Sequence, residues 1–143
     1  MTTTVKPPTW FWVVTVLALL WNLMGVSNYL YQAFNQVAIL ESLDQTQREV
    51  FESTPAWATA AFALAVFSGL IGSIALLLRK KWARPLFIIS LLTAIVQFNH
   101  WLFISDAVEA FGPSTYTMPL IVIIIGLYLI FFAKQGIRKG WLK

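Results

Sequence analysis

The feature that most constrains this chain is a set of four long apolar segments, none of which contains Asp, Glu, Lys or Arg. A helix needs about 20 mostly apolar residues to cross the hydrocarbon core of a bilayer. The four segments reach or approach that length and cover residues 9–31, 55–78, 85–104 and 117–133. Since backbone hydrogen bonds in lipid must be made within the segment, the pattern predicts four membrane-spanning α-helices.

The composition agrees with this prediction and excludes several kinds of site. Charged residues make up 11% of the 143 residues and hydrophobic residues 59%, whereas a soluble domain has about 25% charged residues. The chain has no cysteine, which excludes disulfides and thiolate ligands, and one histidine, which excludes a His-rich metal site within one chain. We therefore expect no metal, no cofactor and no catalytic residues.

The charged residues are segregated between alternate connections. Nine of the ten basic residues flank one side of the predicted spans: Lys6, Arg79, Lys80, Lys81, Arg84, Lys134, Arg138, Lys139 and Lys143. All the acidic residues lie on the other side, in loops 32–54 and 105–116: Glu41, Asp44, Glu49, Glu52, Asp106 and Glu109. Lys and Arg near span ends stay in the cytoplasm, so we expect both termini inside and both acidic loops outside. The same segregation explains the basic pI without nucleic acid.

Aromatic residues support the same boundaries. Tryptophan settles at the headgroup level of a membrane, and six of the seven tryptophans lie near predicted span ends: Trp10, Trp12, Trp57, Trp82, Trp101 and Trp141. The first span has no small-residue cleavage pattern behind it, so we expect a retained helix rather than a removed signal peptide. The expected fold is all-α, an antiparallel four-helix membrane bundle formed by one domain, with residues 79–84 as its inner loop.

The first outer loop has the pattern of a short amphipathic helix. Apolar residues recur at helical spacing at Leu40, Leu43, Val50 and Phe51. This predicts a surface helix over residues 42–53. Ser42 and Gln45 have the spacing of a capping box. Arg48 lies four residues from a carboxylate on either side, which predicts ion pairs along the polar face.

Polar residues within the spans are amides and one imidazole. Five form a candidate polar pocket, with three aromatic residues nearby: Asn22, Asn28, Gln97, Asn99 and His100, with Trp21, Tyr29 and Trp101. One interpretation is an outward-facing pocket between the first and third spans, suited to a sugar-like solute. The other, which we favour, is hydrogen bonding between those spans, which contributes about 0.6–2 kcal/mol for each bond.

The second span carries small residues at regular spacing. They form a row spaced by four and a second row beside it: Ala61, Ala65, Gly69 and Ser73, then Ser68 and Gly72. Small side chains let helix backbones approach closely in lipid, so the pattern predicts tight packing. The partner is left open, because the first span, the fourth span or another protein would fit. The fourth span is apolar on all sides, which suits contact with lipid or a partner.

Three motifs carry a resemblance to a known family. They are QRxxFESTPAW at residues 47–57, LLLRKKWARPLFIISL at 76–91 and WNLMG at 21–25. Over roughly residues 15–100 the chain resembles a family of small bacterial four-span membrane proteins, largely uncharacterised and sometimes labelled sugar transporters. The resemblance implies the same topology and a bacterial inner membrane. It implies no site residues.

Two functions from different classes fit these patterns. The first is a non-enzymatic inner-membrane protein that acts through helix packing, as an accessory subunit of a membrane complex or as a homo-oligomer. The small-residue rows, the apolar fourth span and the absence of charge within the spans favour it. The alternative is a small-solute transporter or binder that uses the polar pocket. An enzyme is disfavoured, because no paired carboxylates in a cleft and no nucleophile–base arrangement are indicated.

Overall fold

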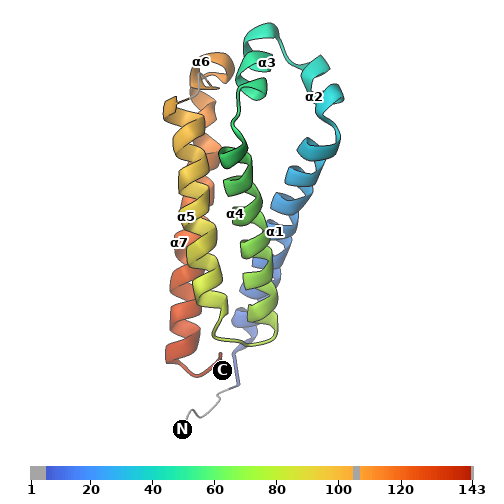
Figure 1. Cartoon of the computed structure of the whole chain (residues 1–143). Coiled ribbons are helices and arrows are strands. Elements are labelled where there is room, and N and C mark those ends of the chain that lie inside the picture. Colours follow the sequence, from blue (N-terminus) through green and yellow to red (C-terminus); the bar gives the residue numbers. More distant parts are fainter. Residues whose placement is uncertain (1–5, 105–106, 143) are drawn as a thin grey trace.

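Four long antiparallel helices form the body of the protein, and each is long and apolar enough to cross a membrane (Figure 1). The computed structural model describes residues 6–104 and 107–142. The helices are α1 (Thr9–Phe34), α2 (Gln36–Ser42), α3 (Gln45–Glu52), α4 (Ala56–Leu77), α5 (Ala83–Asn99), the π-helical turn η1 (His100–Ile104), α6 (Ala107–Phe111), the 3-10 turn η2 (Pro113–Tyr116) and α7 (Thr117–Arg138). The predicted all-α membrane bundle is confirmed.

The observed helices extend beyond the apolar segments at three points, the first of which is the start of α5 at Ala83, before the expected start at residue 85. α1 ends at Phe34 and α7 ends at Arg138, beyond the expected ends at residues 31 and 133. The difference has a simple cause. The first and fourth predicted spans end where the apolar run ends, before Gln32 and Lys134, whereas Gln and Lys are good helix formers and continue the backbone hydrogen bonds.

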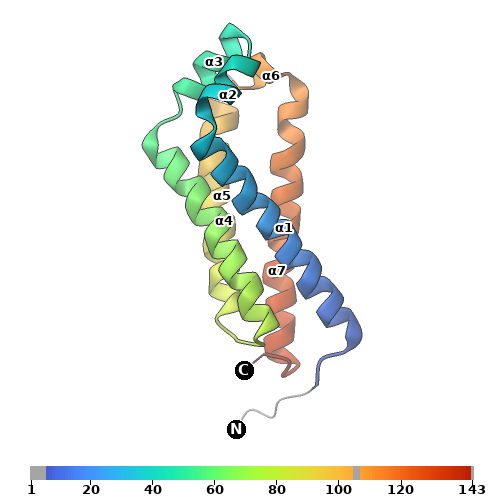
Figure 2. The ribbon, with the colours of Figure 1, turned by 90° about the vertical axis from the view of Figure 1, so that its right-hand side faces the viewer.

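α4 is the central helix of the bundle. It packs against α1 on one side and α5 on the other, and α5 also packs against α7. α1 crosses the bundle obliquely (Figure 2), and it diverges from α7 toward the end where α2 and α3 lie (Figure 1). The bundle is therefore closed at one end and splayed at the opposite end.

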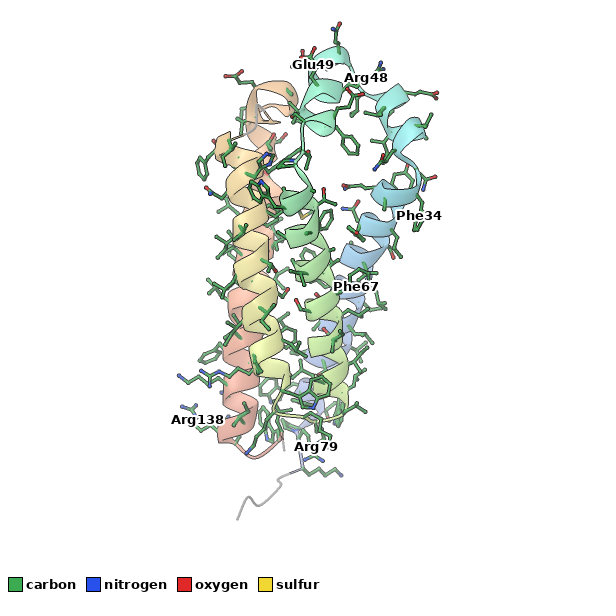
Figure 3. The ribbon with its side chains drawn as sticks, viewed as in Figure 1. Phe34, Arg48, Glu49, Phe67, Arg79 and Arg138 are labelled. Atoms are coloured by element: carbon green, nitrogen blue, oxygen red, sulfur yellow. The ribbon has the colours of Figure 1, made fainter. Side chains whose placement is uncertain are left out.

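The two ends of the bundle differ in charge. α1 begins and α7 ends where α4 turns into α5, and Arg79 and Arg138 mark this basic end, which comprises residues 79–84 and 134–142 (Figure 3). Arg48 and Glu49 mark the opposite, acidic end, where α2, α3 and α6 cover the bundle and which comprises residues 41–52 and 107–116. The described charged residues thus lie at the two ends of the bundle as predicted from the sequence. Asp106 lies outside the described residues.

An aromatic cluster closes the basic end. The Phe132 ring of α7 stacks on Phe11 of α1 at 5.4 Å and meets Trp10 edge-on at 5.7 Å. Beyond α7 the chain folds back, with Gly140 at φ +79° and the Trp141 N–H donating to the Gly136 carbonyl at 2.8 Å. Glycine adopts this φ without a Cβ clash. Trp141 is thereby buried against the cluster, and α1 is tied to α7 at this end.

The basic turn holds the folded-back chain in place. Arg79 Nε donates to the Trp141 carbonyl at 2.9 Å, and Arg79 itself has φ +56°. Leu142 is 2% exposed and packs in the same core as Leu76 and Ala83. The turn between α4 and α5 is therefore more than a connection, because it joins the middle of the chain to its C-terminal segment.

The first outer loop forms two helices where one was predicted. α2 ends at Ser42, whose hydroxyl donates to the Ile39 carbonyl at 2.7 Å, and α3 begins after Asp44. The Asp44 carboxylate accepts from the Gln47 N–H at 2.8 Å, and Gln47 Oε1 accepts from the Asp44 N–H at 3.3 Å. The predicted cap at Ser42 is wrong. The sequence has two overlapping capping-box spacings, and the ionised side chain forms the stronger bond to the helix N-terminus.

The predicted ion pairs of Arg48 are also wrong. Among the described residues Arg48 pairs with neither Asp44 nor Glu52. Its guanidinium donates to the Leu40 carbonyl at 3.1 Å and to the Leu43 carbonyl at 3.5 Å. These carbonyls belong to the C-terminal end of α2, which carries partial negative charge. The Leu40 carbonyl also accepts from the Leu43 N–H at 3.3 Å. Arg48 therefore joins α3 to α2.

Replacing Asp44 tests the observed cap. We expect Asp44→Ala to lower the local stability of α3 by about 1 kcal/mol, because the Gln47 N–H loses its acceptor. Amide hydrogen exchange over residues 45–52 should become faster, and the thermal midpoint of the bundle should stay unchanged. Glu41→Ala is the matched control, since it removes an exposed acidic side chain from α2. Equal exchange rates in α3 for both variants would show that Asp44 is not the cap.

Candidate functional site

A cavity of about 1300 Å³ lies between α1, α4, α5 and α7, in the half of the bundle toward the acidic end. α2 and α3 cover it through Leu40, Leu43 and Phe51. Its origin is the oblique course of α1, which is tied to α7 at the basic end and diverges from it toward the acidic end (Figure 1). We call this space the inter-helix cavity.

The inter-helix cavity brings together three of the five polar residues proposed for a pocket. Asn22, Asn28 and Gln97 line it, and the three proposed aromatic residues line it as well: Trp21, Tyr29 and Trp101. The lining comes from all four spans rather than from the first and third alone. It is thus a broader space than the sequence suggested.

The other two proposed pocket residues lie elsewhere. Asn99 is exposed and outside the cavity lining, because it follows Gln97 by two positions, which turns its side chain by about 200° around the helix. His100 is 6% exposed and packs edge-on against Trp57 of α4 at 5.2 Å. It begins the π-helical turn η1, where the changed winding directs the imidazole toward α4.

Asn22 serves the packing of α1 on α4 at the cavity wall. Its side-chain Nδ2 donates to Ser73 Oγ at 3.0 Å and to the Ala18 carbonyl at 2.8 Å, and the residue is 9% exposed. Hydrogen bonding between spans was the favoured interpretation of this amide. The partner, however, is the second span and not the third, because α4 lies between α1 and α5.

Three polar side chains in the cavity lining have no hydrogen-bond partner within the part of the chain that the structure describes. They are the indole of Trp21, the hydroxyl of Tyr29 and the amide of Gln97. Edge-on contacts with Phe62 at 5.5 Å and Phe67 at 5.8 Å hold the Tyr29 ring in place. The polar atoms of these three side chains are not fully buried. These three groups are therefore available to a bound molecule.

The small residues of α4 pack inside the chain. Both rows are buried: Ala61, Ala65, Ser68, Gly69, Gly72 and Ser73. A Cβ at Gly69 would overlap the Asn22 Oδ1, and a Cβ at Gly72 would lie 3.0 Å from the Phe87 ring of α5. Ser90 Oγ of α5 donates to the Ala65 carbonyl at 2.6 Å. The partners of the small-residue rows are thus α1 and α5.

Sequence reasoning missed several residues of the cavity. Ser90, Gln32 and Gln36 line it, together with Ser114 and Thr115 before α7. One signal could have found Ser90. Residues 90, 94, 97 and 101 are spaced by four, three and four, which places Ser90 on the same helix face as Gln97 and Trp101.

The charges of the lining are few. Among the described residues the cavity lining contains one ionisable acidic side chain, Glu52, and no Lys, Arg or His. The described part of the chain also has no group of three or more His, Asp, Glu or Cys that could hold a metal ion. Apart from Glu52, the lining residues can bind a molecule by hydrogen bonds from uncharged groups, by contact with aromatic rings and by apolar packing.

The fold and the cavity define a class: a four-helix membrane protein with a cavity between its helices whose described lining is uncharged apart from Glu52. Comparisons with protein-family models, curated proteins and solved structures found no match for this chain. The resemblance to small bacterial four-span proteins therefore stays a prediction from the motifs.

Proposed function

We propose that this chain is a non-enzymatic membrane protein that binds a small molecule in the inter-helix cavity. The observation that carries the proposal is the set of unpaired polar side chains, Trp21, Tyr29 and Gln97, inside a space of about 1300 Å³. Ligand cavities are concave, mostly apolar and contain a few polar groups that fix orientation. Both features are present on rigid helices, which position these groups.

The proposed location is a bacterial inner membrane with both termini in the cytoplasm and the cavity in the outer half of the bilayer. Two observations support it. The basic residues gather at the end where α1 begins and α7 ends, and the acidic residues of α2 and α3 gather at the other end. The positive-inside rule then places the basic end in the cytoplasm.

An accessory or oligomeric role has less support than the sequence suggested. The small-residue rows of α4, which favoured an external partner, pack against α1 and α5 of the same chain. All four spans still expose apolar side chains that a partner could cover, and those of α7 include Leu120, Ile124 and Leu127. Lipid tails alone can cover such a face.

Leucine substitutions in the cavity lining test binding without disturbing the helix packing. We expect the double variant Asn28→Leu, Gln97→Leu to retain a bound compound about tenfold less than the wild type, since each neutral hydrogen bond contributes about 0.5–1.5 kcal/mol. The protein is purified in mild detergent, and the small molecules released from it are identified and quantified by mass spectrometry. Asn22 is left unchanged because it bonds to Ser73.

Asn99→Leu is the matched control, because Asn99 is an exposed amide of the same helix outside the cavity lining. It should retain the compound as the wild type does. Two results would overturn the proposal: a wild-type protein that carries no compound at all, or a well-folded double variant that carries as much as the control.

A further inference from the structure

We infer that the ligand of the inter-helix cavity is an amphiphile from the bilayer with an uncharged polar headgroup, bound with its head toward the acidic end and its tail toward the middle of the membrane. This inference rests on the proposed function and adds the chemical class of the ligand. Three features of the cavity carry it: the order of polar and apolar residues along its length, its charge, and the place of its exposed rim.

The lining becomes more apolar with depth. Toward the acidic end it combines the polar residues Gln32, Gln36, Thr54, Ser114 and Thr115 with the apolar residues Leu40, Leu43 and Phe51. Toward the middle of the bundle it includes apolar side chains of α5 and α7: Phe87, Leu91, Val122, Ile125 and Leu129. A sugar-like solute would match the first zone and leave the second without a partner. A molecule with a polar head and a hydrocarbon tail matches both.

The charge of the lining selects the headgroup. A phosphate or carboxylate head would lie in a cavity whose described lining has no Lys, Arg or His to pair with it. Burying a charge without a partner is strongly unfavourable, and the Glu52 carboxylate adds repulsion. A zwitterionic lipid has the same difficulty, since it also carries a phosphate. Hydroxyl, amide or glycosyl heads can instead bond to Gln97 and Tyr29.

The rim of the cavity opens toward the membrane. Three residues that line the cavity are also more than half exposed: Met24 at 63%, Tyr31 at 54% and Met118 at 56%. Met24 and Tyr31 belong to α1 and Met118 belongs to α7, the two helices that diverge toward the acidic end (Figure 1). Because the rim lies on membrane spans, a lipid can enter from the side without crossing water.

A probe series separates this inference from the proposed function. The full-length protein in mild detergent is incubated with monooleoylglycerol, with oleoyl lysophosphatidylglycerol, which has the same tail and an anionic head, or with glucose, which has no tail. Native mass spectrometry counts the bound molecules. We expect one monooleoylglycerol for each chain, about tenfold preferred over the anionic lipid because of the unpaired buried phosphate, and no bound glucose.

Substitutions in the apolar zone show where the probe binds. Ala94 is 5% exposed and lines the cavity, so Ala94→Phe should fill that zone and abolish binding of monooleoylglycerol. Leu92→Phe is the matched control, because Leu92 is 58% exposed on the same helix and lies outside the lining. It should bind the probe as the wild type does. If Ala94→Phe fails to fold, Val122→Phe fills the same zone from α7.

The outcomes distinguish the two statements. Preference for the anionic lipid or for glucose would overturn the inference, and so would equal probe binding by the folded filling variant and the control. The proposed function would survive each of these results if the compound that co-purifies with the wild type is still lost in the Asn28→Leu, Gln97→Leu variant.

Discussion

Phe132→Ala is expected to lower the free energy of unfolding by about 3 kcal/mol, the largest single effect in this chain. The value is at the low end of the range for Phe→Ala in soluble cores, because lipid can solvate the ring in the unfolded state. Phe132 is 1% exposed and its ring contacts Phe11, Trp10 and Tyr128. Removing it would leave a cavity where α1 joins α7, so the basic end of the bundle would loosen.

The neighbouring residue provides the control. Phe131 is 57% exposed and faces away from the cluster, so Phe131→Ala should change the unfolding free energy by about 0.5 kcal/mol or less. Both variants are unfolded with a denaturing detergent and followed by tryptophan fluorescence, to which four of the seven tryptophans contribute from the basic end: Trp10, Trp12, Trp82 and Trp141. Equal losses for the two variants would mean that the aromatic cluster does not hold α1 to α7.

The number of spans and the segregation of charge could be predicted because they depend on composition within short windows. A segment without charge over about 20 residues has few alternatives to a membrane helix. Composition within such windows did not predict where the helices end. Arg138 still belongs to α7 and Ser42 ends α2, because both positions are decided by hydrogen bonds to specific neighbours and not by hydropathy.

The cavity could not be predicted, because it depends on the angle between helices. Gln97, Asn99 and His100 are polar residues within four consecutive positions. The rotation of α5 about its axis places Gln97 in the cavity lining and Asn99 outside it. The π-helical turn at His100 changes that rotation locally. A single sequence shows that polar residues share a span, and the packing of the neighbours decides which of them share a cavity.

The small-residue rows of α4 show the same limit of prediction from a single sequence. Their spacing predicted close approach of helices, and the residues of both rows are buried in α4, the most buried of the four spans. It could not say that both neighbours lie in the same chain. That depends on the length of the connections, because the short turn between α4 and α5 and the longer α2–α3 segment allow α4 to take the central position.

Gly69→Ala should have the second-largest effect, a loss of about 2 kcal/mol of unfolding free energy. The added Cβ would overlap Asn22 Oδ1 and would lie 3.1 Å from Ser90 Oγ. The Asn22 amide cannot move aside freely, because its Nδ2 bonds to Ser73 and to the Ala18 carbonyl. The substitution therefore breaks a hydrogen bond between α1 and α4 or pushes the two helices apart.

A double-mutant cycle identifies the cause of that loss. If the overlap with the Asn22 amide is the main cause, Gly69→Ala should be less damaging in an Asn22→Ala background, with a coupling energy of about 1 kcal/mol. The remaining loss would come from Ser90. Unfolding in denaturing detergent provides all four values. Additive losses would show that α4 tolerates a methyl group beside Asn22, and the close approach of α1 to α4 at Gly69 would then not stabilise the bundle.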